Sequence, residues 1–178
     1  MKIPNLRFLV SHPAHFIACG LGSGLSPVAP GTAGTAFAWV TYALLRHGYP
    51  ADANFGLFLV FMLVFGTWCV HITGRDLGEP DHGAIVWDEI VPFWAVLMFL
   101  PPAIIDSPHG VLFSAGGLAW QGMAFVLFRL FDIIKPPPAS YFDREMKNGL
   151  GVMLDDVAAA GYTIIVLALL RMLIDRFG

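Results

Sequence analysis

The chain has 178 residues, of which 57% are hydrophobic and only 13% are charged, and its formal net charge is −3. Its mean hydropathy is +0.69. This composition excludes intrinsic disorder and nucleic-acid binding, and it is too apolar for an ordinary soluble domain. The length fits a single domain over residues 1–178, and a lipid bilayer is the expected surrounding.

The N-terminal residues do not predict a signal peptide. Lys2 and Arg7 precede an apolar run, but that run breaks at Ser11-His12-Pro13 and is shorter than the hydrophobic core of a signal peptide. We therefore expect no cleavage there.

Uncharged stretches predict the membrane helices, because about 20 apolar residues cross a hydrocarbon core of about 30 Å. The stretches 53–74, 90–105 and 107–128 contain no Asp, Glu, Lys or Arg and predict three spans. Residues 157–174 predict a fourth span, in which the long side chain of Arg171 can extend to the membrane–water interface. The apolar run 35–45 is short and follows Gly- and Pro-rich chain, so it is a full helix, a tilted helix or a re-entrant segment.

The distribution of basic residues favours a crossing by 35–45, since cytoplasmic loops carry an excess of Lys and Arg. With four spans the basic residues divide equally between the two faces, whereas five spans place most of them on the N-terminal face. We therefore predict an all-α polytopic membrane bundle of about five helices with a cytoplasmic N-terminus. The basic residues on that face would be Lys2, Arg7, Arg75, Arg129, Lys135, Arg144 and Lys147, and those on the other face Arg46, Arg171 and Arg176. Most acidic residues fall on the same cytoplasmic face, which predicts an acid-rich site there.

The first polar motif is GLGSGLSPVAPGTAGT, residues 20–35. Its glycines permit positive φ angles, and exposed N–H groups before a helix could bind a phosphate, with Ser26, Gly31 and Thr32 as candidate contacts. The motif lacks the Lys and the spacing of a P-loop. The alternative is a flexible turn that leads into the membrane, with Thr32 as the N-cap of the next helix.

The second motif is DHGAIVWDE, residues 81–89. Asp88 and Glu89 lie where a helix is expected to begin, and the helix dipole alone could account for carboxylates at that position. Asp81 and His82 could add a metal ligand or a proton carrier, although a single loop histidine is commonly just solvated.

The third motif is FRLFDIIKPPP, residues 128–138, at the expected end of a helix. The dipole disfavours an anion at this end, so Asp132 needs a cationic partner. Arg129, three residues earlier, could pair with it, and a divalent metal would meet the same need. The three prolines then end the helix.

The fourth motif is GLGVMLDDV, residues 149–157. Its two adjacent acids repel each other and point about 100° apart on a helix, so stability alone does not explain the pair. Carboxylate oxygens are the ligands that Mg²⁺ selects, and the absence of Cys/His ligand spacing argues against zinc. The candidate metal ligands are Asp88, Glu89, Asp132, Asp155 and Asp156.

In this order and spacing, the four motifs resemble those of the phosphatidylglycerophosphatase A family, over about residues 16–161. These are bacterial Mg²⁺-dependent phosphatases that convert the membrane lipid phosphatidylglycerophosphate to phosphatidylglycerol. The resemblance implies an enzyme of the bacterial inner membrane with its active site facing the cytoplasm. It also implies functional carboxylates at Asp81, Asp88, Glu89, Asp132, Asp155 and Asp156, and phosphate-facing cations at Arg129 and Lys135.

On this interpretation Mg²⁺ neutralises phosphoryl oxygens, Arg129 or Lys135 stabilises equatorial charge, and a carboxylate or His82 handles the proton. A covalent aspartyl-phosphate remains possible, although the D-x-D-x-T signature is absent. The competing class is a small ion or solute transporter, since acids within the membrane can mark an ion path. A transporter predicts acids near mid-span, whereas here they gather at predicted helix ends.

Overall fold

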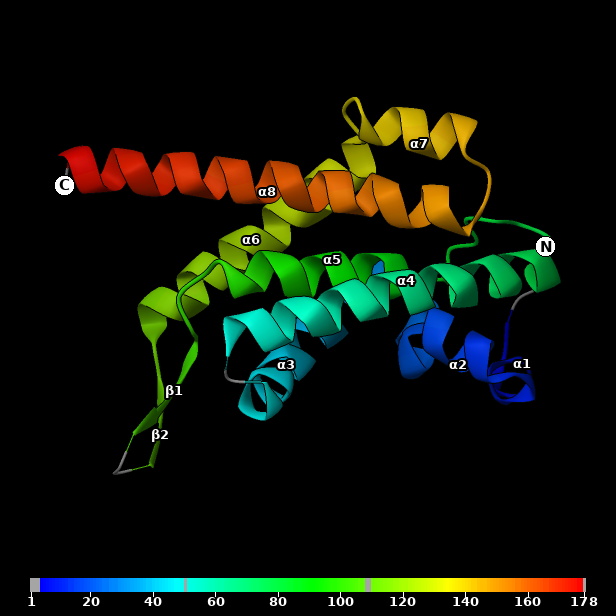
Figure 1. The fold of residues 1–178 in the computed structure, drawn as a ribbon, viewed down its shortest axis with the longest axis horizontal. Coiled ribbons are helices and arrows are strands. Elements are labelled where there is room, and N and C mark those ends of the chain that lie inside the picture. Colours follow the sequence, from blue (N-terminus) through cyan, green and yellow to red (C-terminus); the bar gives the residue numbers. More distant parts are fainter. Residues whose placement is uncertain (1–3, 50, 108–109, 178) are drawn as a thin grey trace.

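The computed structural model describes residues 4–49, 51–107 and 110–177. It confirms the predicted all-α class and adds one short hairpin (Figure 1). In chain order the elements are α1 (Leu6–Ser11), α2 (Pro13–Ala18), the 3-10 helix η1 (Gly20–Leu25), α3 (Pro30–Gly48), α4 (Asp52–Leu77), α5 (Trp87–Met98), β1 (Ile104–Ser107), β2 (Gly110–Phe113), α6 (Ala115–Ile134), α7 (Ala139–Glu145) and α8 (Gly149–Phe177).

Helix α5 forms the centre of the bundle. It packs against α3, α4, α6 and α8, and Figure 1 shows α4 and α8 running alongside it. Phe93 on α5 packs against Phe128 on α6, with 5.4 Å between ring centroids. Trp94 donates its indole N–H to the carbonyl oxygen of Ala38 on α3 at 3.0 Å. These contacts hold the middle of α5, whose first turn carries part of the second acidic motif, against the neighbouring helices.

The predicted span 90–105 is wrong as a continuous membrane-crossing helix. Helix α5 has 12 residues, which corresponds to a length of about 18 Å, well short of a hydrocarbon core of about 30 Å. It ends before Pro101 and Pro102, and neither proline can donate the backbone hydrogen bond that would continue the helix. The apolar side chains of α5 are buried against neighbouring helices. The apolar sequence of α5 therefore does not require that this helix cross the membrane.

The predicted start of the span 107–128 at residue 107 is also wrong. Strands β1 and β2 form an antiparallel hairpin that pairs Ile104 with Phe113. Helix α6 begins only at Ala115, because the side chain of Ser114 caps it by accepting a hydrogen bond from the Gly117 N–H at 3.0 Å. The absence of charged residues therefore identifies an apolar segment here, but it does not show where the helix begins.

Three described helices are long and apolar enough to cross a membrane, namely α4, α6 and α8. They correspond to the predicted spans 53–74, 107–128 and 157–174. The ambiguous run 35–45 lies inside α3, a continuous helix of 19 residues. The run is therefore one unbroken helix, although α3 is not among the three candidate spans.

Neighbouring helices alternate in direction, so α3, α5 and α8 begin where α4 and α6 end. Gly31 at the start of α3 lies against Glu89 at the start of α5. Arg129 near the end of α6 contacts the same Glu89, and Gly149 at the start of α8 lies against His71 near the end of α4. We call this the acidic end of the bundle and the opposite one, which carries β1 and β2, the hairpin end (Figure 1).

Candidate active site

A cleft of about 350 Å³ lies at the acidic end, between the start of α3, the start of α5, the end of α6 and the first turns of α8. The sequence-predicted residues that line it are Gly31, Asp81, Asp88, Glu89, Arg129, Asp132, Lys135, Asp155 and Asp156. The fold thus brings together residues that are more than 120 positions apart along the chain. The uncharged neighbours Ala29, Pro30, Gly83, Ile85 and Ile133 complete the lining.

The start of α5 supplies two buried carboxylates. Asp88 and Glu89 lie in the first turn of α5, where the helix dipole favours negative charge. Both residues are buried, with exposures of 5% and 8%. Burial raises the pKa of Asp88 well above its usual range, and the neighbouring Glu89 charge raises it further.

The end of α6 supplies a guanidinium that bridges two helices. Nη1 of Arg129 lies 2.8 Å from Oε1 of Glu89 and 2.7 Å from Oδ2 of Asp132. The predicted pairing of Arg129 with Asp132 is therefore confirmed. Because Arg129 also holds Glu89, the same cation connects α6 to α5.

Two glycines let the start of α3 approach these acids. A Cβ on Gly31 would lie 2.0 Å from Oε1 of Glu89, and a Cβ on Gly34 would lie 2.6 Å from Cβ of Val86. Any side chain at Gly31 would displace the Glu89 carboxylate. Helix α3 begins at Pro30 with Ala29 as its N-cap, so Thr32 is not the N-cap that the alternative interpretation of this motif required.

Lys135, at the end of α6, is enclosed by three carboxylates. Its Nζ lies 2.5 Å from Asp155, 2.8 Å from Asp143 and 3.6 Å from Asp81. These ion pairs raise the pKa of Lys135 and lower that of Asp143. Carboxylate oxygens of the three acids lie within 4.8 Å of one another, which is close enough to hold a metal ion. Sequence reasoning missed Asp143, which lies on the short helix α7.

Several buried polar atoms around the cleft have no hydrogen-bond partner in the described part of the chain. They are Oδ1 of Asp88, Oε2 of Glu89, Nε of Arg129 and Oδ1 of Asp156. An unpaired buried polar atom is costly, so a cluster of them indicates that something else satisfies them. Carboxylate oxygens are hard ligands, so the acids of this cluster fit a cation such as Mg²⁺.

Three predicted site residues do not line the cleft. His82 is buried, and its Nδ1 accepts a hydrogen bond from the Ala84 N–H at 3.1 Å. Ser26 donates to the carbonyl oxygen of Val28 at 2.8 Å, and Thr32 lies in the first turn of α3 outside the lining. His82 and Ser26 therefore make contacts that shape their own loops.

Comparison with known proteins finds similar chains in three bacteria. The chain is 37% identical to phosphatidylglycerophosphatase A of Escherichia coli strain K12 over 88% of this chain and 83% of that protein. It is 38% identical to the Haemophilus influenzae protein of the same name, over 92% and 91% of the two chains. A Bacteroides thetaiotaomicron protein with the provisional name of a phosphatidylinositol-3-phosphatase is 34% identical over 89% and 93% of the two chains.

No solved structure matches the chain. The described fold gathers all four acidic and glycine-rich motifs at one cleft, and the chain matches the model of one family over residues 16–171. The chain belongs to the phosphatidylglycerophosphatase A family.

Proposed function

We propose that the chain removes the terminal phosphate of phosphatidylglycerophosphate by hydrolysis, giving phosphatidylglycerol and inorganic phosphate, with Mg²⁺ as cofactor. The observation that carries this proposal is the set of unpartnered buried atoms on Asp88, Glu89, Arg129 and Asp156 around one cleft. The names of the Escherichia coli and Haemophilus influenzae relatives support the choice of substrate.

The charge of the cleft supports a requirement for a cation. Six carboxyl groups line it, but only Arg129 and Lys135 oppose them. A phosphomonoester is itself an anion, so the cleft would repel it unless further positive charge were bound. Asp88, Glu89 and Asp156 would hold Mg²⁺, since each has a buried oxygen without a partner among the described residues. Glu89 would do so through Oε2, because its Oε1 pairs with Arg129. Bound Mg²⁺ would neutralise phosphoryl oxygens and position the attacking water.

The residues of the chain would bind the phosphate and move the proton. The free Nε–H of Arg129 would donate to a phosphoryl oxygen, and the first N–H groups of α3 would face the same anion. Asp81 has a half-exposed side chain at the cleft, near the Lys135 ammonium, and would accept the proton of the water. The new P–O bond forms as the ester P–O bond breaks, and the glycerol oxygen takes up a proton.

The cation distribution supports a cytoplasmic location of the cleft. Among the described residues, the acidic end carries Arg75, Arg129, Lys135, Arg144 and Lys147 on or beside the ends of α4, α6 and α7. Of the other two basic residues predicted for this face, Arg7 lies on α1 and Lys2 lies outside the described residues. The hairpin end carries Arg46, Arg171 and Arg176. By the positive-inside rule the acidic end would face the cytoplasm of the bacterial inner membrane. The transporter alternative has less support, because the acids gather at one end of the bundle rather than at mid-depth.

The test is phosphate release by the purified protein in detergent, with Mg²⁺ and with a chelator. We expect Mg²⁺-dependent release from phosphatidylglycerophosphate, abolished in Asp156→Asn and retained in the control Asp175→Asn, since Asp175 is exposed near the end of α8. Phosphatidylinositol-3-phosphate with the same acyl chains serves as the competing substrate, because a relative carries that provisional name. Faster release from the inositol lipid, or no release from either, would contradict the proposal.

A further inference from the structure

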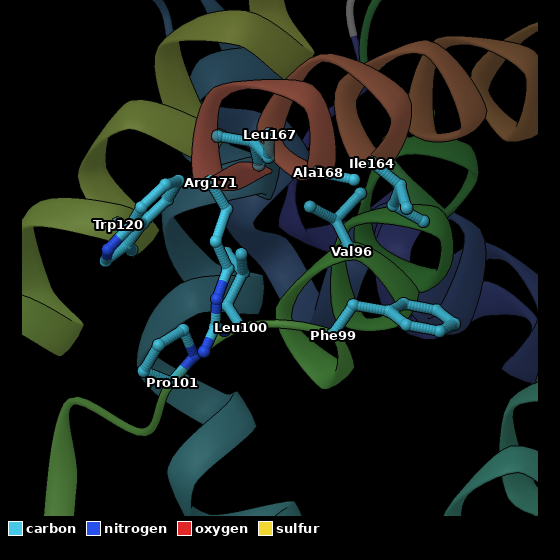
Figure 2. Close-up of a pocket in the computed structure, with 9 residues that line it drawn as sticks. All are labelled: Val96, Phe99, Leu100, Pro101, Trp120, Ile164, Leu167, Ala168 and Arg171. Carbon is cyan, nitrogen blue, oxygen red and sulfur yellow. The ribbon is translucent and has the colours of Figure 1, made fainter. Parts of the chain in front are cut away.

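A second cavity lies at the hairpin end, between the end of α5, the chain that follows it, α6 and α8 (Figure 2). Its volume is about 180 Å³, enough for part of one acyl chain but not for a whole lipid. Val96, Leu100, Trp120, Ile164 and Leu167 contribute to its largely apolar wall. Arg171 is the one charged residue among those that line it.

The guanidinium of Arg171 is available to a ligand. Figure 2 shows its side chain extending from α8 across the cavity toward Leu100 and Pro101. Its ion pair with Asp175 joins Nε to the carboxylate at 3.9 Å, so the terminal nitrogens have no partner within the described residues. Arg46, at the same end of the bundle, instead contacts Asp52 at 2.6 Å. Arg171 thus presents free hydrogen-bond donors beside an apolar cavity.

The position of Arg171 along α8 separates this cavity from the acidic cleft. Fifteen residues separate Asp156 from Arg171 along α8, which is about 22 Å at the helical rise. Because the hydrocarbon core is about 30 Å thick, a cleft at one interface places Arg171 within side-chain reach of the opposite interface. A cation at that depth needs an anion or water beside it.

We propose that this cavity binds an anionic phospholipid of the leaflet farther from the acidic cleft, with one acyl chain in the cavity and the phosphate on Arg171. Charge complementarity selects this occupant. The apolar wall suits a hydrocarbon chain, while the free guanidinium nitrogens can donate two hydrogen bonds to a phosphate. Free phosphate would leave the apolar wall uncovered, and a lipid without net charge would match the cation less well. This binding site is independent of the reaction proposed for the cleft.

The test is binding of individual lipids to the delipidated protein in detergent, measured by native mass spectrometry and by the midpoint of thermal unfolding. The probes are phosphatidylglycerol and phosphatidylcholine with identical acyl chains, and inorganic phosphate. We expect tighter binding and a higher midpoint with phosphatidylglycerol, and no shift with phosphate alone. Arg171→Gln should weaken the phosphatidylglycerol affinity about ten-fold, the size expected for hydrogen bonds between charged groups.

Arg176→Gln is the matched control, because Arg176 lies on the same helix outside the cavity lining. It should keep the preference for phosphatidylglycerol. Ala168→Phe should fill the cavity and weaken both lipids while leaving Arg171 in place, and it provides a second test if Arg171→Gln does not fold. Equal preference for phosphatidylglycerol in Arg171→Gln and the parent would overturn the proposal. So would undiminished lipid binding in folded Ala168→Phe.

Discussion

Gly31 and Glu89 are in such close contact that a Cβ on the glycine would lie 2.0 Å from the carboxylate Oε1. The same Cβ would lie 2.9 Å from both terminal nitrogens of Arg129. The absence of a side chain at Gly31 therefore sets the position of an ion pair that links α5 to α6. This close packing places the glycine-rich motif against the acidic cleft.

Gly31→Ala should reduce phosphate release about 100-fold, the loss typical of an ångström-scale displacement of catalytic groups. Kinetics of the purified variant in detergent would measure the loss. The control is Gly48→Ala on the same helix, where an added Cβ meets no atom of the described residues within 4 Å. Full specific activity in Gly31→Ala, combined with a low folded yield, would show that this glycine serves only the fold.

The Glu89–Arg129 pair should show strong coupling in stability. Arg129→Gln should lower the free energy of unfolding by about 3–5 kcal/mol, because it leaves Glu89 and Asp132 buried without their cation. Adding Glu89→Gln to this variant should restore part of the loss, since one unpaired charge is then removed. Thermal unfolding in a double-mutant cycle measures the coupling. Strictly additive losses would contradict the shared ion pair.

The Asp143–Lys135 pair predicts an acid-dependent contribution to stability. Lys135 lowers the pKa of Asp143 below the usual aspartate value of about 4. The pair therefore stabilises the fold above that value, and this stabilisation is lost as the pH falls through the lower folded-state pKa. Asp143→Asn should destabilise the protein at pH 7, and the difference from the parent should shrink in acid. Glu145→Gln, an exposed position on the same helix, should show no such difference.

The membrane orientation can be tested with single cysteines, because Cys19 and Cys69 are buried free thiols. Glu145→Cys at the acidic end should resist an impermeant thiol reagent added to intact cells, whereas Asp175→Cys at the hairpin end should react with it. Both should react after the membrane is permeabilised. The reverse pattern in intact cells would place the cleft outside the cytoplasm.

The composition and the four motifs were sufficient to predict the helical class and most of the acidic cleft. The helix dipole makes an anion costly at the C-terminus of a helix, so the position of Asp132 predicted a cationic partner. Arg129 is that partner. The adjacent residues Asp155 and Asp156 lie in different surroundings. Asp155 contacts Lys135, while Oδ1 of Asp156 has no partner among the described residues. Each of these inferences depends on local chain geometry.

Features that depend on tertiary packing could not be predicted in the same way. The apolar side chains of α5 pack against neighbouring helices. In the sequence alone, such a buried apolar helix looks like a membrane span. Asp143 reaches Lys135 only because the chain folds back through the proline-rich turn 136–138 into α7. A histidine such as His82 is a common proton carrier. Here, however, its Nδ1 accepts a hydrogen bond from the Ala84 N–H within its own loop.

The most direct test of the cleft as a cation site is the rise in thermal stability caused by Mg²⁺. At a concentration 100 times Kd, Mg²⁺ should stabilise the parent by about 2.7 kcal/mol. Asp156→Asn should lose most of this response, because it removes an unpartnered buried oxygen donor, while the control Asp175→Asn should retain it. If Asp156→Asn keeps the full Mg²⁺ response of the parent, Asp156 does not bind the cation and the proposed active site is wrong.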